Sequence, residues 1–325
     1  MRAKVCVAVM AALMAGQALQ ARAERPGQAG FEPGGADRVL LRLRLEKGKS
    51  YLLKVTMDQK IVQTVMGNEQ KITQKMGMGY AFDITDVDAD GMMSGKVTYK
   101  SVVFEQQGPM GLVKYDSENP PEKVHPMAAG FAALAGSSFT MKMTALGRVK
   151  ELAGVSEMLK KIISDLPDGP QKKIMAKQFE TQFGDKAIGE MMENMMAYYP
   201  DKAVGVGGRW VQTMILSKGF PMTIENTYTL KDRKNGTAIL GVASTIKPNK
   251  KAEPLKMGQM TMTYTMTGTQ EGTLSMDEAT GWIRAGTLKQ DIAGEIKLDG
   301  IPGADQPMNL PMTVKSEITY ESTLK

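Results

Sequence analysis

Residues 76–84 alternate apolar with polar or small side chains at a period of two. The apolar positions of this stretch hold Met76, Met78, Tyr80, Phe82 and Ile84. Such alternation buries one face of a β-sheet and leaves the other face in water. The stretch is therefore predicted to be a strand. The tight-turn pair Asp90-Gly91 that follows predicts a hairpin over about 80–105.

Two further stretches show the same period. Residues 53–65 place apolar side chains at alternate positions, but Gln59 and Gln63 interrupt the apolar series. Residues 260–267 alternate methionine or tyrosine with threonine. Asn235-Gly236 provides a second hairpin turn between predicted strands. Antiparallel strands are therefore expected in both the first and the last third of the chain.

The middle of the chain has helical spacing instead. Apolar side chains recur every three or four residues over 155–166 and again over 188–199. This spacing places one apolar stripe along an amphipathic helix. A block of helices is therefore predicted over 155–200, and it includes a further helix over about 170–183. A shorter helix is expected over about 126–134.

The two β-rich parts follow the same order of turn signals, which predicts an internal duplication. Corresponding pairs are Gly48-Lys49-Ser50-Tyr51 with Gly207-Gly208-Arg209-Trp210, Asp90-Gly91 with Asn235-Gly236, and a strand turning at Gly147 with a strand turning at Gly281. The alternative is that unrelated hairpins share the same turn residues.

The predicted fold class is α+β, with duplicated antiparallel β-sheet units and a central block of amphipathic helices. The first β unit is assigned to residues 38–154, the helical segment to 155–200 and the second β unit to 201–325. Two separate domains or one continuous curved half-barrel would both satisfy this pattern.

The first 23 residues have the parts of a secretory signal peptide. A positively charged start precedes an almost wholly apolar run over 5–19, and Ala21 and Ala23 are small residues suited to signal peptidase. The run is short for a membrane span, although a retained anchor is the alternative. Residues 24–37 are expected to form a flexible lead-in. The mature protein is thus expected in the periplasm or outside the cell, after cleavage at about Ala23.

Composition narrows the classes of partner. The only cysteine, Cys6, lies in the predicted signal peptide, so the mature chain can form neither disulfides nor thiolate metal sites. The formal net charge of +6 becomes +3 (6 − 3) when Arg2, Lys4 and Arg22 leave with the signal. Acidic and basic residues alternate along the rest, so no nucleic-acid partner is predicted. No transmembrane segment is expected in the mature chain, and protein partners are undetermined.

No catalytic or cofactor motif is predicted. His125 is the only histidine, and a Ser/His/Asp triad would need it together with a Gly-x-Ser-x-Gly elbow that the chain lacks. Ser244 and Lys247 have a nucleophile-like spacing but would point to opposite faces of a strand. A carboxylate pair from distant strands would leave no local signature. The protein is expected to be non-enzymatic and to carry no cofactor.

One acidic motif begins like a calcium-binding loop. Asp86-x-Asp88-x-Asp90-Gly91 has the right start, but the twelfth position, where such a loop needs a bidentate glutamate, holds Val97. A plain hairpin turn is therefore favoured over a metal site.

Methionine is unusually frequent, with 28 residues in the chain. Its flexible, polarizable side chain suits an irregular apolar surface. The residues predicted to line a ligand groove are Met76, Met78, Met191, Met195, Met260 and Met262. Two alternatives stay open. The methionines could fill an ordinary core or, as the less favoured reading, their thioethers could bind Cu(I).

Several segments resemble an uncharacterised family of secreted bacterial proteins, a domain of unknown function. They are residues 41–51, the turn at 85–91, Tyr115-Asp116-Ser117 and residues 200–210. The resemblance implies export and a shared fold without implying an activity. More loosely, a curved sheet with helices is similar to the half-barrels that carry lipids or lipoproteins across the periplasm.

Together these features predict an exported, non-enzymatic binding or carrier protein for an apolar, lipid-like ligand. The ligand would lie between the curved sheet and the methionine-rich helices. The alternative is a structural or interaction protein with a filled core and no ligand.

Overall fold

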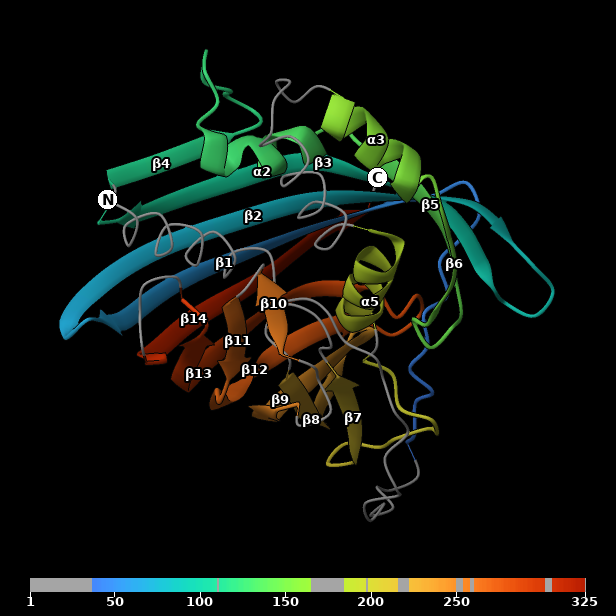
Figure 1. Cartoon of the computed structure of the whole chain (residues 1–325). Helices are drawn as coiled ribbons and strands as arrows, with labels where there is room; N and C mark the ends of the chain where they lie inside the picture. Colours follow the sequence, from blue (N-terminus) through green and yellow to red (C-terminus); the bar gives the residue numbers. More distant parts are fainter. Residues whose placement is uncertain are drawn as a thin grey trace.

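The described residues form one large β-sheet with short helices (Figure 1). The computed structural model describes residues 37–109, 111–164, 184–196, 198–215, 222–249, 254–257, 260–301 and 306–324. Three sequence predictions lie outside the described residues. They are the signal peptide at 1–23, the lead-in up to residue 36 and the helix over 170–183.

Long antiparallel strands dominate the fold. In the first half they are β1 (Ser50–Val65), β2 (Asn68–Val87), β3 (Met93–Gly108), β4 (Gly111–Asp116), β5 (Ser138–Met143) and β6 (Val149–Ala153). In the second half they are β7 (Arg209–Ile215), β8 (Met222–Lys234), β9 (Thr237–Pro248), β10 (Leu255–Met257), β11 (Met260–Tyr264), β12 (Thr267–Asp277), β13 (Ile283–Asp299) and β14 (Met308–Leu324). The alternating stretch 76–84 lies in β2, as its period predicts.

These strands belong to one open, curved sheet (Figure 1). Its main order is β6-β5-β3-β2-β1-β14-β13-β12-β9-β8-β7, with β4 beside β3 and β11 beside β13. The two halves are joined by β14, which pairs with β1 on one side and with β13 on the other. The two predicted β regions are therefore halves of one continuous sheet, and the predicted α+β class is confirmed.

The strand order repeats between the two halves. In the first half of the sheet, neighbouring strands follow the order β1, β2, β3, β5, β6. In the second half, the corresponding strands follow the order β7, β8, β9, β12, β13 in the same direction across the sheet. Register shifts occur at matching places, between Ile84 and Asp86 of β2 and between Leu230 and Asp232 of β8. The strand β4 in one half and the pair β10 and β11 in the other are additions to a shared plan. This order supports an internal duplication.

Hydrogen bonds at the starts of the two repeats also match. Gly48 N donates to Ile84 O at 2.8 Å, and Gly207 N donates to Leu230 O at 2.7 Å. Both glycines have positive φ, +79° and +86°, which residues with a Cβ rarely adopt. In each half, a backbone hydrogen bond from the turn glycine thus connects the segment just before the first strand of the repeat to the second strand.

Short helices lie over one part of the sheet. They are η1 (Pro126–Ala128), α2 (Ala129–Leu134), α3 (Val155–Ser164) and α5 (Asp185–Met196). Helix α2 contacts β3, α3 contacts β5 and α5 contacts β6 (Figure 1). They agree with the helices predicted near 126–134, 155–166 and 188–199. Within the part of the chain that the structure describes, no helix is long and apolar enough to cross a membrane.

Candidate ligand-binding face

The two faces of the sheet differ in character. On β1, Tyr51, Met57 and Ile61 are buried, whereas Asp58 and Lys60 on the opposite face are exposed. We call the face with the buried side chains the inner face, because side chains of α2, α3 and α5 pack on it. Strand alternation therefore separates an apolar inner face from a charged outer face.

The inner face carries two apolar clusters. The helix cluster combines strand side chains with helical ones such as Phe131, Met158 and Met192. The strand cluster lies farther along the strands, and its buried members are aliphatic or methionine side chains from strands and one strand junction. They are Ile61, Ile72, Ile224, Ile246, Met262, Met266, Ile292, Ile296, Leu298, Leu310, Met312 and Val314.

A row of neutral polar side chains crosses the inner face between the two clusters. From β3 to β7 in sheet order it consists of Gln106, Gln74, Gln59, Ser316, Gln290, Gln270, Ser244, Asn226 and Gln212. Each member is the direct register partner of the next, so the row runs straight across the strands. We call these residues the polar belt. On β1, for example, Gln59 lies between Met57 of the helix cluster and Ile61 of the strand cluster.

Hydrogen bonds connect most of the polar belt. Gln74 Nε2 donates to Gln106 Oε1 at 3.2 Å, and Gln59 Nε2 donates to Ser316 Oγ at 3.0 Å. Farther along the sheet, consecutive bonds connect Gln290, Gln270, Ser244 and Asn226. Buried amides and hydroxyls need such partners, because they have been removed from water.

Two acceptors of the belt are left over. Among the described side chains, Gln59 Oε1 and Gln74 Oε1 are buried and have no hydrogen-bond partner. Gln59 and Gln74 are register partners on β1 and β2, so these oxygens belong to adjacent side chains. A buried acceptor without a partner costs roughly 1–3 kcal/mol. An additional donor that reached this part of the belt would therefore stabilise the structure.

The buried tyrosines on the inner face of the belt strands stay uncharged. Burial raises the pKa of Tyr320, four residues beyond the belt residue Ser316 on β14, to about 12. Burial likewise raises the pKa of Tyr228 on β8 and of Tyr80 on β2 far above the ordinary value. These hydroxyls are protonated at neutral pH, so the strand residues around the belt present neutral groups.

The predicted methionines divide between the two clusters. Met76, Met191 and Met195 are buried in the helix cluster, and Met78 packs against it. Met262 is buried in the strand cluster, and Met260, at the start of β11, is half-buried. The structure therefore brings four of the six together and places Met260 and Met262 on the far side of the polar belt. Their role in ligand binding stays a prediction.

The sequence singled out two members of the belt for unrelated reasons. Gln59 interrupts an apolar series, and Ser244 forms the nucleophile-like spacing with Lys247. In the structure Ser244 is buried on the inner face and donates to Asn226 Oδ1 at 2.6 Å, while Lys247 is exposed. The two side chains point to opposite faces, as predicted, and Ser244 is part of the belt.

The other candidate residues have local structural roles. His125 is exposed, and its Nδ1 accepts a hydrogen bond from Met127 N at 3.2 Å at the start of η1. Asp88 Oδ1 accepts from Asp90 N at 3.0 Å and from Met92 N at 2.9 Å, which closes the predicted hairpin turn. Within the described ranges, no three His, Cys, Asp or Glu side chains gather where they could hold a metal ion.

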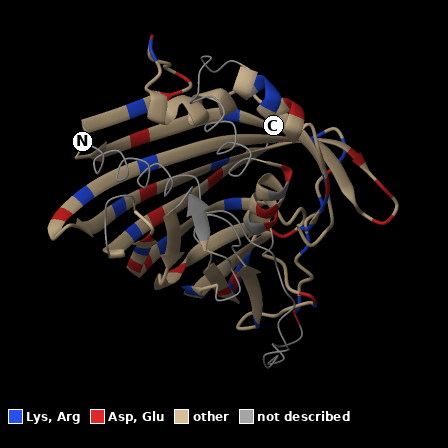
Figure 2. Cartoon of the chain, in the orientation of Figure 1, with Lys and Arg blue, Asp and Glu red and all other residues tan. Residues whose placement is uncertain are grey.

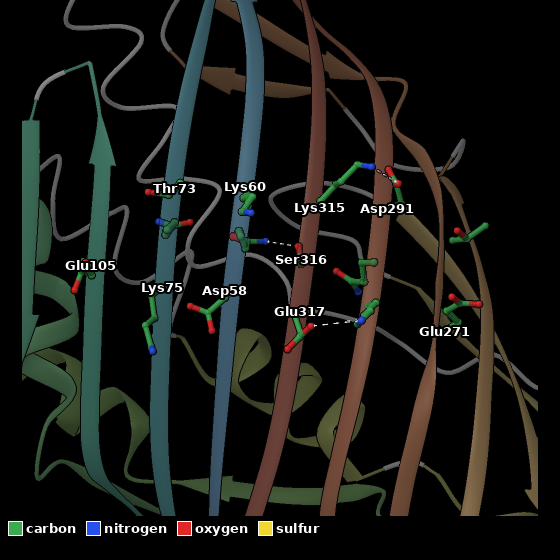
Figure 3. A pocket seen from close by; sticks show the side chains of 15 residues that line it. Asp58, Lys60, Thr73, Lys75, Glu105, Glu271, Asp291, Lys315, Ser316 and Glu317 are labelled. Carbon is green, nitrogen blue, oxygen red and sulfur yellow. Dashed lines mark hydrogen bonds and ion pairs between the residues drawn. The ribbon is translucent and has the colours of Figure 1, made fainter.

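The outer face behind the belt is an open groove of about 870 Å³ (Figure 3). Lysines, carboxylates and threonines line it together with the belt residues Gln59, Gln74, Gln290 and Ser316, and Lys315 pairs with Asp291 at 3.2 Å. Both side chains of this pair are more than half exposed (70% and 58%), so the pair contributes little to stability. Positive and negative residues are interspersed along the strands (Figure 2). This face has the character of a solvated surface.

Comparison with known proteins identifies a family and a distant likeness in fold. The model of a family of unknown function, DUF6263, matches residues 90–283, more than half of the chain. No protein with a curated description matches. A solved structure of lipovitellin, titled for its lipid–protein interactions, has a TM-score of 0.46 at 10% identity over 86% of this chain. This chain spans only 26% of that lipovitellin chain.

Two bacterial structures are more distant still. The translocator domain of the autotransporter NalP from Neisseria meningitidis has a TM-score of 0.22 and 7% identity, covering 86% of this chain and 90% of its own. OccK7 of Pseudomonas aeruginosa has a TM-score of 0.20 and 6% identity, covering 85% of this chain and all of its own (100%). Likeness at this level indicates nothing about a ligand.

Proposed function

Because the chain belongs to a family of unknown function, we propose its ligand from the inner face of the sheet and its export from the signal-peptide features of the first 23 residues. It is an exported, non-enzymatic carrier or binding protein for an apolar, lipid-like ligand. The ligand lies against the inner face and is held mainly by burial of its hydrocarbon part.

The strand cluster is the observation that carries this proposal. A sheet face as apolar as this one must be covered by other protein or by a ligand. Its buried side chains are at most 9% exposed in the structure, so binding requires the strand cluster to open. The described helices α2, α3 and α5 contribute side chains to the helix cluster, whereas the strand cluster is built from the strands. Its isoleucines, leucines and methionines offer flexible aliphatic contacts that suit an acyl chain.

The energy available from such contacts is sufficient for binding. Each methylene moved from water to an apolar surface contributes about 0.8 kcal/mol. A chain of about twelve buried methylenes would therefore gain on the order of 10 kcal/mol before the entropic costs of association. If half of that gain is lost to those costs and to incomplete burial, about 5 kcal/mol remains, which corresponds to a dissociation constant in the sub-millimolar range; micromolar affinity needs roughly 3 kcal/mol more, from polar contacts or a longer chain.

Titration of the delipidated protein with a neutral fluorescent lipid, a pyrene-labelled long-chain alcohol, tests the proposal. Saturable binding is expected, and Val314→Trp, which fills space in the strand cluster, should weaken it. Lys315→Trp is the matched control, because it adds the same side chain to the outer face of the same strand. Absence of saturable binding to the unaltered protein would contradict the carrier role and leave a structural protein with a filled core.

Native mass spectrometry of the protein from its own cells gives an independent test. A co-purified lipid mass is expected for a carrier, whereas the bare protein mass supports the filled-core alternative. Export is tested on the same material by N-terminal sequencing, which should begin at about Glu24. A sequence beginning at Met1 in cytoplasmic extract would contradict export.

A further inference from the structure

The polar belt divides an otherwise apolar face at a place where a ligand would cross it. On β1, β2, β8, β9, β13 and β14 the belt residue separates members of the helix cluster from members of the strand cluster. A ligand whose hydrocarbon chain is bound against the strand cluster therefore ends at the belt or has a polar group there. A ligand made of hydrocarbon alone would leave the belt facing apolar atoms.

The unpaired acceptors indicate which kind of ligand group the belt can bind. Gln59 Oε1 and Gln74 Oε1 are neighbours, both side chains are at most 9% exposed, and neither oxygen has a partner among the described side chains. A carbonyl oxygen can only accept a hydrogen bond, so its missing partner is a donor. Hydroxyl and amide N–H groups are the neutral donors that lipids carry.

The charge of the site selects against ionic head groups. None of the belt residues carries a charge, and Asp58, Lys60 and Lys75, the charged neighbours of Gln59 and Gln74 along β1 and β2, lie on the opposite face of the sheet. A phosphate or carboxylate buried here would lack a cationic partner, and an ammonium would lack an anionic one. Burial of an unpaired charge is strongly unfavourable. The fitting group is therefore polar and neutral.

Strand register alone does not explain the belt. If the only role of these side chains were to fix the strand register, their acceptors should be bonded within the row. The second half of the belt, from Gln290 to Asn226, is bonded in this way. Duplication does not explain it either. Ile84 and Leu230 are equivalent by their bonds to Gly48 and Gly207, yet Gln74 lies ten residues before Ile84 (84 − 74) and Asn226 four before Leu230 (230 − 226). The belt is aligned across positions that the repeat does not make equivalent.

We infer that the polar belt at Gln59 and Gln74 binds the hydroxyl or amide donor of a neutral amphiphile, whose hydrocarbon chain lies on the strand cluster. This inference rests on the proposed carrier function and names its ligand class. Monoacyl and diacyl glycerols, long-chain alcohols and acyl amides belong to this class, whereas anionic phospholipids and plain hydrocarbons do not.

Three fluorescent probes with matched hydrocarbon parts test the inference. They are a pyrene-labelled diacylglycerol, the same molecule with its hydroxyl converted to a methyl ether, and a pyrene-labelled alkane. The full-length mature protein should bind the diacylglycerol about tenfold more tightly than the ether, because only the hydroxyl supplies a donor. Equal affinity for diacylglycerol and ether would overturn the inference while leaving the carrier function intact. Failure of all three probes to bind would overturn both.

A double variant locates the recognition. Gln59→Leu with Gln74→Leu should abolish the preference for the hydroxyl and keep or improve alkane binding. The matched control is Gln63→Leu, because Gln63 is equally buried on the inner face of β1 but already bonds to Gln70 at 3.1 Å. The control should keep the tenfold preference. Retention of the preference in the double variant would overturn the assignment to the belt. Far-UV circular dichroism checks folding, and the probe comparison on the unaltered protein does not depend on the variant.

Discussion

Replacing Gln74 with glutamate tests whether the polar belt lies in an interior that excludes water. Gln74 is 3% exposed and lies between Ile72 and Met76 on the inner face of β2. Glutamate has almost the same shape, so the substitution mainly changes whether a charge can form there. Burial disfavours the ionised form, and the pKa of the introduced carboxyl rises.

The expected cost depends on pH in a definite direction. Below the ordinary pKa of glutamate, the carboxyl is protonated in the folded and unfolded chains alike, and the variant should unfold much as the unaltered protein does. Above that pH, the unfolded chain releases its proton and the folded chain keeps it. The free energy of unfolding then falls by about 1.4 kcal/mol per pH unit. If the buried carboxyl keeps its proton to roughly pH 7, the loss at that pH reaches about 3–4 kcal/mol.

Urea unfolding at pH 4 and pH 7, followed by circular dichroism, measures this difference. Gln107→Glu on the neighbouring strand β3 is the matched control, because Gln107 is exposed on the outer face opposite Thr73. The control should cost little at either pH. If both variants lost the same free energy of unfolding at pH 7, the reasoning would be refuted, because water would then reach the belt.

Three further perturbations test parts of the fold. Gly281→Ala should cost about 2 kcal/mol more in urea unfolding than Gly236→Ala. Both glycines have φ near +70° (70° and 69°), but only at Gly281 would an added Cβ clash with a backbone oxygen, that of Arg42. Equal costs would contradict the close approach. Arg233 and Glu278, joined by bonds of 2.8 and 2.9 Å, should show a coupling of about 1–3 kcal/mol in a double-mutant cycle, and zero coupling would contradict this. Burial raises the pKa of Glu193, so the unaltered protein loses stability when this carboxyl ionises in the unfolded chain. The stability of Glu193→Gln relative to the unaltered protein should therefore increase from pH 4 to pH 7 in thermal unfolding. A gain that is the same at both pH values would argue against that shift.

The sequence by itself determined the local features of this protein. The period of two over 76–84 predicts a strand because it depends only on neighbouring residues and on which face water reaches. The turns at Asp90-Gly91 and Asn235-Gly236 are readable for the same reason, since Gly91 and Gly236 both adopt positive φ. Their repeated order also indicates the duplication that the strand order supports. The signal peptide and the non-enzymatic role stay predictions.

Only the tertiary structure decided which strands are neighbours and at what register. Whether the two β regions were domains or one sheet depended on β14, whose pairing with β1 connects Gln59 to Ser316 across most of the chain. The polar belt needs the correct register on every strand from β3 to β7, because a shift of one residue would turn a side chain to the other face. A single glutamine in an apolar series is visible in the sequence, but its alignment with eight others is a long-range property. For the same reason, the predicted methionines could be assigned to an interior but not to the two sides of the belt.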